Sequence, residues 1–246
     1  HADEIRFHQF VQFQFRRQWG ELRRYANERD IRIVGDLPIF VAHDSADVWA
    51  HQRLFRLDPD GRPLVVAGVP PDAFSDSGQH WGNPHYDWDA IAADGHAWWI
   101  DRVRASLDLV DVLRIDHFRG FAAAWVIPVD APSAAFGRWE RGPGTAVFAA
   151  IQRVLGELPF IVEDLGVITD AVVALREDLR LPGMKVLQFA FGGDPDNFYL
   201  PHTYEPNCVV YPATHHNQTT VSWFTSLPEW QSQNVRRYLG KDGSDI

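Results

Sequence analysis

The sequence predicts an α/β protein with the fold of a (β/α)8 barrel that is incomplete in this chain. Short apolar segments typical of strands alternate with segments of helical periodicity, and such alternation favours a parallel sheet. Polar residues stand at or just past the ends of these predicted strands, where a barrel gathers its functional side chains on one rim. These residues are Asp36, Asp116, Glu163 and His215.

The predicted elements follow in chain order. Apolar residues three and four apart predict a helix over residues 11–26, and the first strand is predicted at 31–34, with 35–38 turning the chain out of it. Later helices are predicted at 98–109, 147–155 and 171–179, the last with Thr169 as its cap. Later strands are predicted at 110–115, 160–162, 185–189 and 208–211.

These strands are fewer than the eight that a barrel needs, although 246 residues match the usual length of about 250. We therefore expect residues 1–246 to be one barrel domain in fragment form, without the first and last βα units. The absence of an initiator Met is consistent with this expectation. Residues 57–94 are rich in Pro, Gly, Asp and His and lack periodicity, so a long inserted loop region is predicted there. Long ordered loops usually carry function.

Composition narrows the choice of partners. Acidic residues number 33 against 23 Lys and Arg, and the formal net charge of −10 argues against a nucleic acid or an anionic membrane surface. A neutral substrate fits better, and the 13% of aromatic residues is compatible with sugar binding, although most aromatic side chains fill cores. Cys208 is the only cysteine, and no apolar run approaches the roughly 20 residues of a membrane span. We expect a cytoplasmic protein without a membrane partner.

Two motifs place carboxylates at strand ends: LRIDHFRG at residues 113–120 and IVEDLG at residues 161–166. A retaining glycosidase uses one carboxylate as nucleophile and a protonated one as acid, about 5 to 5.5 Å apart. Asp116 fits the first role, because Arg114 would point to the same side of an extended strand and keep it ionised. Glu163 fits the second role if burial or a neighbouring charge, such as Asp164, keeps it protonated. Taken alone, each motif is more often an ordinary ion pair.

Five longer segments resemble, in the same order, segments of the amylomaltases, the 4-α-glucanotransferases of glycoside hydrolase family 77. They are GDLPIFVAHDSADVWA at 35–50, VAGVPPDAFSDSGQHWGNPHYDW at 66–88, LRIDHFRGF at 113–121, VEDLG at 162–166 and PGMKVLQFAF at 182–191. The resemblance covers nearly the whole chain. It implies a single catalytic barrel domain that moves α-1,4-glucan segments between maltooligosaccharides in starch and glycogen metabolism, with no metal and no cofactor.

The resemblance also implies a role for each candidate residue. Asp116 is expected to form a covalent glucosyl enzyme, Glu163 to act as acid and then as base, and Arg114 to orient Asp116. Other residues are expected to bind the sugar, some of them in a loop at residues 72–81 that would cover the bound glucan and exclude water. This substrate-binding set comprises Asp36, Asp72, Phe74, Gln79, Trp81, His117, His215 and His216. For Asp36, a structural loop cap is the alternative.

Two residues depart from the family pattern. The family reads Thr-His-Asp-Asn where this chain has Thr-His-His-Asn at residues 214–217, so His216 replaces a carboxylate that is expected to stabilise the transition state. Ala73 stands where the covering loop usually has Tyr, so weaker glucan binding is expected. Impaired transfer activity is therefore predicted.

These departures keep a second interpretation open, a non-catalytic glucan-binding homologue. A third interpretation is a divalent metal site on the barrel rim, although no HxH or HExxH spacing supports it. Its candidate ligands are His117, His215, His216, Asp116, Glu163 and Asp164.

Overall fold

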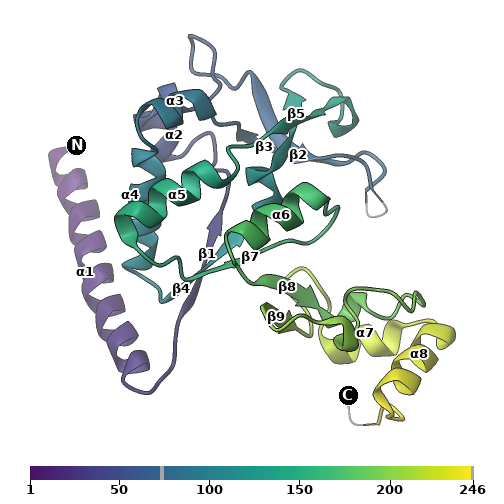
Figure 1. Cartoon of the computed structure of the whole chain (residues 1–246). Coiled ribbons are helices and arrows are strands. Elements are labelled where there is room, and N and C mark those ends of the chain that lie inside the picture. The colour runs from purple at the N-terminus through teal and green to yellow at the C-terminus, as the bar shows by residue number, and fades with distance from the viewer. Residues whose placement is uncertain (73–74, 245–246) are drawn as a thin grey trace. The chain divides into compact units, whose positions relative to one another are not determined.

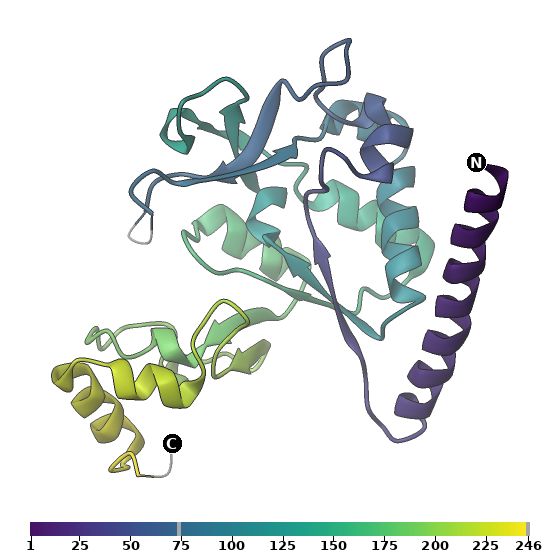
Figure 2. The same ribbon diagram turned by 180° about the vertical axis from the view of Figure 1, so that it is seen from behind.

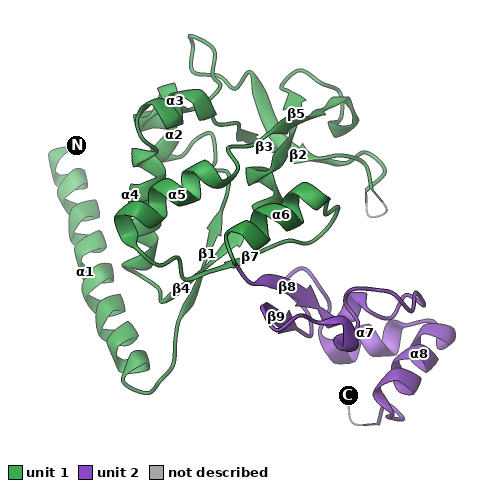
Figure 3. Ribbon diagram, viewed as in Figure 1, with its two compact units in different colours: residues 1–180 green, residues 181–246 purple. Residues whose placement is uncertain are grey.

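The computed structural model describes residues 1–72 and 75–244 of the chain. The chain divides into two compact units, residues 1–180 and residues 181–246 (Figure 3). Among the described residues, the first unit has a parallel sheet of three strands and the second a parallel pair. These strands are the counterparts, in order, of those that the sequence predicts, and the α/β class is confirmed. A single barrel domain over residues 1–246 stays a prediction.

The parallel sheet of the first unit has β4 in its centre, between β1 and β7 (Figure 1). Its strands are β1 (Val34–Pro38), β4 (Val112–Asp116) and β7 (Phe160–Val162). Val112 and Leu113 of β4 point to opposite faces of the sheet and are both buried, as expected of a strand that is covered on both faces. In register, Asp36 lies opposite Arg114, and the three strands run in the same direction. Their carboxyl ends therefore meet at one edge of the sheet.

β1 differs from the predicted first strand. The sequence predicts a turn at residues 35–38, but these residues are extended and pair with β4. A Cβ on Gly35 would lie 2.8 Å from Val110 Cγ1, so only glycine fits this close approach. Asp36 thus lies inside β1 and not after its end. The prediction was wrong because Gly, Asp and Pro are typical of turns, whereas pairing with a distant strand holds this segment extended.

Residues 57–94, predicted as a long loop, contain regular elements. They include β2 (Val65–Val69), β3 (Gln79–Pro84) and the short helix α3 (Trp88–Ala93). β2 and β3 form an antiparallel sheet, in the order β3-β2-β5-β6, with β5 (Ala123–Pro128) and β6 (Arg138–Arg141). Because β5 lies far along the chain from β2, the periodicity of residues 57–94 alone does not indicate these strands.

Aromatic side chains form much of the core between the helices of the first unit. α4 packs beside α5 (Figure 1), and Trp99 of α4 contacts Phe121, with 5.3 Å between ring centroids. Phe121 in turn contacts Phe148 of α5 at 4.8 Å, and all three rings are fully buried. The α-helices of this unit are α1 (Ala2–Asn27), α2 (Ala46–Ala50), α3, α4 (Ala97–Leu107), α5 (Thr145–Leu155) and α6 (Asp170–Asp178).

Helix α1 runs along the outside of the first unit (Figures 1 and 2). None of its residues is buried, and it is attached by polar contacts. Trp19 Nε1 donates to the Leu109 carbonyl at 2.7 Å, and Arg23 Nε donates to Asp111 Oδ1 at 2.9 Å. No helix among the described residues is long and apolar enough to cross a membrane.

Over its described residues, the second unit contains a parallel strand pair, two α-helices and two short 3-10 helices. β9 has the predicted bounds, whereas β8 ends before residues 187–189, which form a short 3-10 helix. Phe191, Phe224 and Val235 are buried in this unit. Its elements are β8 (Gly183–Val186), β9 (Cys208–Tyr211), α7 (Thr220–Ser226) and α8 (Glu229–Leu239).

Candidate active site

Asp116 is the last residue of β4 and shares an arginine with Asp36. Arg114 Nη1 donates to Asp116 Oδ1 at 2.7 Å and to Asp36 Oδ1 at 2.6 Å. Burial alone would lower the pKa of Arg114, but the hydrogen bonds and negative charges of the two aspartates raise it above its ordinary value. The guanidinium therefore stays charged between two carboxylates. The contact between Arg114 and Asp116 that the sequence predicts is present.

Glu163 directly follows β7 and lies beside the end of β4. Its N–H donates to the Ile115 carbonyl at 2.9 Å, which extends the strand pairing one step towards Asp116. Neighbouring strands lie about 4.8 Å apart, so the two carboxyl groups start from adjacent positions on one edge of the sheet. This placement is compatible with the separation of about 5 to 5.5 Å that a retaining mechanism requires.

Both carboxyl oxygens of Glu163 accept main-chain hydrogen bonds. The His117 N–H donates to Oε2 at 2.8 Å, and the Leu165 N–H donates to Oε1 at 2.9 Å. Burial raises the pKa of Glu163, and the charge of Asp116 raises it further, while the two N–H groups and Arg114 oppose this rise. Burial prevails, so this carboxyl keeps its proton to a higher pH than an exposed glutamate.

Asp164 does not have the role that the sequence suggested for it. The negative charge that helps to raise the pKa of Glu163 comes from Asp116. Asp164 Oδ2 instead lies 3.4 Å from Arg176 Nε, in an ion pair of two largely buried side chains. Adjacency in sequence misled here because successive residues of an extended chain point to opposite sides.

The imidazole of His117, the residue after Asp116, contacts strand β3. Its ring meets the ring of Trp81 edge to face, with centroids 4.8 Å apart, and Trp81 Nε1 donates to Gln79 Oε1 at 3.0 Å. Burial lowers the pKa of His117 to about 3, so the ring is uncharged at neutral pH. Three of the predicted substrate-binding residues thus lie in one chain of contacts that begins next to Asp116.

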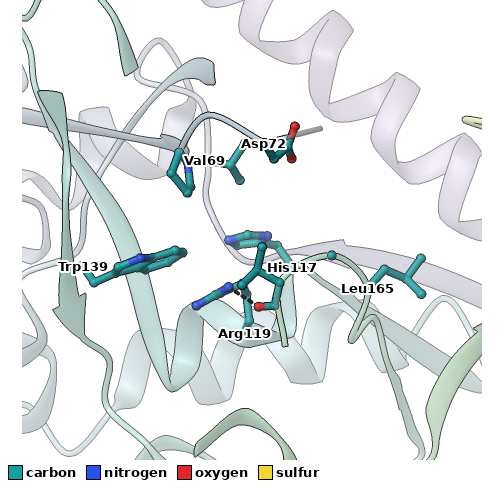
Figure 4. A pocket seen from close by; sticks show the side chains of 9 residues that line it. Val69, Asp72, His117, Arg119, Trp139 and Leu165 are labelled. Atoms are coloured by element: carbon teal, nitrogen blue, oxygen red, sulfur yellow. Dashed lines mark hydrogen bonds between the residues drawn. The ribbon is translucent and has the colours of Figure 1, made fainter. Parts of the chain in front are cut away.

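The segment between β2 and β3 carries the remaining predicted residues of the covering loop. Asp72 Oδ1 accepts from the Ser75 N–H at 2.9 Å. Asp72 also lines a pocket together with His117 (Figure 4). Phe74, and Ala73 beside it, lie outside the described residues.

The same pocket contains residues that sequence reasoning missed. The guanidinium of Arg119 lies 3.8 Å from the centroid of the Trp139 ring, and its Nη1 donates to the Val167 carbonyl (Figure 4). Arg119 is buried, and its pKa is lowered by burial. The main-chain donors to Glu163 were also missed, since no side-chain pattern indicates a backbone N–H. Arg119 could have been predicted as a site residue, because it belongs to the same motif as Asp116, LRIDHFRG.

His215 and His216 lie in the second unit, in the turn that follows β9. Both are exposed, and their ring centroids are 3.9 Å apart. The turn is closed by Asn217, whose Oδ1 accepts from the Thr214 N–H at 2.9 Å and from its hydroxyl at 2.8 Å. The structure therefore brings Asp36, Arg114, Asp116 and Glu163 together within the first unit, and places the two histidines after a parallel strand of the second.

Within residues 1–72 and 75–244, no group of three or more His, Cys, Asp or Glu side chains is arranged so that it could hold a metal ion. The polar groups at the edge of the sheet instead form an arginine-bridged pair of aspartates beside a buried carboxyl. An ionised carboxylate next to a carboxyl of raised pKa is the pair of groups used by enzymes that break glycosidic bonds with retention.

Comparison with known proteins makes the assignment specific. The family model of 4-alpha-glucanotransferase, glycoside hydrolase family 77, matches residues 1–245, and the chain belongs to this family. The 4-alpha-glucanotransferase of Thermus thermophilus is 52% identical over 98% of this chain, and that of Synechocystis sp. is 53% identical over 96%. The chain spans 49% and 48% of these relatives, which is about half of their length.

A solved structure agrees with the sequence relatives. The amylomaltase of Streptococcus agalactiae in complex with acarbose matches with a TM-score of 0.96 and 40% identity, over 100% of this chain and 50% of that one. A relative from Solanum tuberosum, 52% identical over 93% of this chain, is described as chloroplastic/amyloplastic. Family membership therefore does not fix the compartment, and the cytoplasm stays a prediction.

Proposed function

We propose that this chain carries the nucleophile and the acid/base of a 4-α-glucanotransferase, which moves α-1,4-glucan segments between maltooligosaccharides with retention of configuration. One observation carries the proposal: Asp116 ends β4 and Glu163 directly follows the neighbouring parallel strand β7, but the two carboxyl groups have different electrostatic surroundings. Asp116 is paired with Arg114, whereas burial raises the pKa of Glu163. When the surroundings keep one carboxyl group ionised and raise the pKa of the other, the first suits a nucleophile and the second an acid.

In the first half-reaction, an Asp116 oxygen attacks the anomeric carbon while the glycosidic bond to the leaving oxygen breaks. Glu163 gives its proton to that oxygen, and the donor fragment stays bound to Asp116 as an ester. In the second half-reaction, Glu163 takes the proton of an acceptor hydroxyl, whose oxygen attacks the same carbon and releases Asp116. Arg114 orients the Asp116 carboxylate and balances its charge when it leaves.

The residues around this pair would bind the glucan. Asp36 is half exposed beside Arg114, so its second oxygen can accept from a sugar hydroxyl. Trp81 is partly exposed next to His117, and an indole face suits the apolar face of a sugar ring. Asp72, Gln79 and Phe74 belong to the segment that would cover the bound chain and keep water from the ester, which favours transfer over hydrolysis.

The family pattern also assigns substrate binding to the His215–His216 turn of the second unit, with His216 in place of a carboxylate. An imidazole cannot supply the negative charge that stabilises a developing oxocarbenium ion, so we propose that transfer is impaired. The partners proposed are α-1,4-glucans and maltooligosaccharides, with no nucleic acid, no membrane and no cofactor. The non-catalytic homologue has no observation in its favour beyond this substitution.

Incubation of the purified chain with maltotriose tests the proposal. We expect slow formation of a ladder of longer maltooligosaccharides, together with glucose, resolved by chain length. Transfer without water predicts that the number of reducing ends stays constant, which a reducing-sugar assay measures. A rise in reducing ends without longer products would indicate hydrolysis and contradict transfer. Folded protein that forms no products and binds no maltooligosaccharide would contradict both the enzyme and a glucan-binding role.

A further inference from the structure

The backbone of His117 leaves the strand pairing at the point where the Glu163 side chain needs a donor. The register pairs Ile115 with Val162, so a regular parallel ladder would continue with Glu163 opposite Asp116, and the N–H of residue 117 would bond to the Glu163 carbonyl. Here the Phe118 N–H makes that bond, at 3.1 Å. The His117 N–H is thereby freed and donates to Glu163 Oε2 at 2.8 Å.

A left-handed conformation makes this exchange of partners possible. His117 has φ 52° and ψ 47°, a region that is uncommon for residues with a Cβ and strongly unfavourable for β-branched ones. It turns the chain sharply from β4 into the buried 3-10 helix Phe118–Phe121. Such a conformation persists only where the surrounding structure holds it.

The packing of the imidazole ring stabilises the left-handed conformation of His117. The ring meets Trp81 edge to face at 4.8 Å and lies 6.4 Å from the ring of Phe40. A Cβ on Gly120 would come within 3.3 Å of His117 Cδ2, so the ring also rests against this glycine. Its Nε2 is buried and has no hydrogen-bond partner among the described residues. The ring therefore fills space and makes no polar bond through Nε2.

We propose that His117 is a positioning residue for the Glu163 carboxyl, acting through its main-chain N–H, and that its left-handed conformation presents that N–H. With Leu165 on the other oxygen, the carboxyl is held from both sides by the main chain. The charged groups that act on the Glu163 carboxyl are Asp116 and Arg114. This inference deepens the proposed function, because it concerns the carboxyl that would act as acid and base.

A titration of the unaltered chain tests the contact without any catalysis. The pKa of Glu163 is read from its ¹³C-labelled carboxyl by NMR, assigned with the Glu163→Gln variant. We expect the amide ¹⁵N–H resonances of His117 and Leu165 to shift with the same midpoint as this carboxyl. The Phe118 amide, which bonds to a carbonyl, is the internal control and should shift less. A His117 amide that does not follow the carboxyl would overturn the proposal.

A matched pair of variants separates the backbone from the ring. His117→Asn and His117→Val both remove the imidazole, but Asn tolerates a left-handed backbone and Val does not. Because Asn adopts the left-handed region readily by itself, it can keep this conformation without the packed ring, and we expect it to leave the pKa of Glu163 near its wild-type value. Val should raise it by about one unit, a tenfold change in the ionisation constant, because the carboxylate loses a donor.

Equal pKa shifts in the two variants, or a shift in neither, would overturn the role of the conformation. If the Val variant does not fold, the titration of the unaltered chain still decides whether the contact exists. A chain that fails to transfer glucan gives the same titrations, so failure of this inference is distinguishable from failure of the proposed function.

Discussion

The Asp116→Asn chain is expected to form no ladder of maltooligosaccharides from maltotriose. The substitution keeps the size of the side chain and leaves an oxygen that can accept from Arg114, so the contact at 2.7 Å can persist. The neutral amide is a poor nucleophile, and removal of a nucleophile commonly costs on the order of 10⁴-fold or more in rate. Product formation is measured by chromatography at several enzyme concentrations.

The matched control is Asp178→Asn, which makes the same chemical change at an exposed position of α6. Its rate should equal that of the unaltered chain. Far-ultraviolet circular dichroism and thermal unfolding of both variants show whether each is folded. Transfer at the unaltered rate by folded Asp116→Asn protein would remove Asp116 from the mechanism.

The His216→Asp chain is expected to transfer glucan faster than the unaltered chain, by roughly 100- to 1,000-fold. This is the usual contribution of one preorganised group to transition-state stabilisation, about 2.7 to 4 kcal/mol. The substitution restores the carboxylate that the family pattern has in this turn. Because the side chain at position 216 is exposed, the change should leave the fold of the second unit intact. Initial rates with maltotriose measure the effect.

His8→Asp is the control for this substitution, since it changes the charge in the same way on the exposed helix α1. It should not alter the rate. A His216→Asp chain that is folded and no faster than the unaltered one would contradict the idea that this histidine limits activity.

The sequence predicts best the elements whose pattern is local. β7 and β9 have the predicted bounds because each is a short apolar segment between turn residues. The antiparallel sheet of β2, β3, β5 and β6 was not predicted, because its central pairing, of β2 with β5, joins residues that lie far apart in the chain. Long-range pairing of this kind leaves little trace in the periodicity of any one segment.

In the candidate site, too, contacts between residues close in sequence were predicted and contacts that depend on long-range pairing were not. Alternation along a strand correctly predicts that Arg114 contacts Asp116. The contact of Arg114 with Asp36 depends on the register of β1 against β4, which spacing along the chain does not show. The main-chain bond from His117 to Glu163 depends on the backbone turn at His117, which the spacing of side chains along the sequence does not show.

The covalent intermediate is the most direct test of the central claim that Asp116 is the nucleophile. The Glu163→Gln chain, with and without His216→Asp, is incubated with α-maltosyl fluoride, whose fluoride leaves without needing a proton. Because the variant lacks the base for the second half-reaction, the ester should accumulate. Mass spectrometry of the quenched protein should find one added maltosyl group, on the peptide that contains Asp116. An adduct on another residue, or folded protein that never carries one at Asp116, would contradict the account.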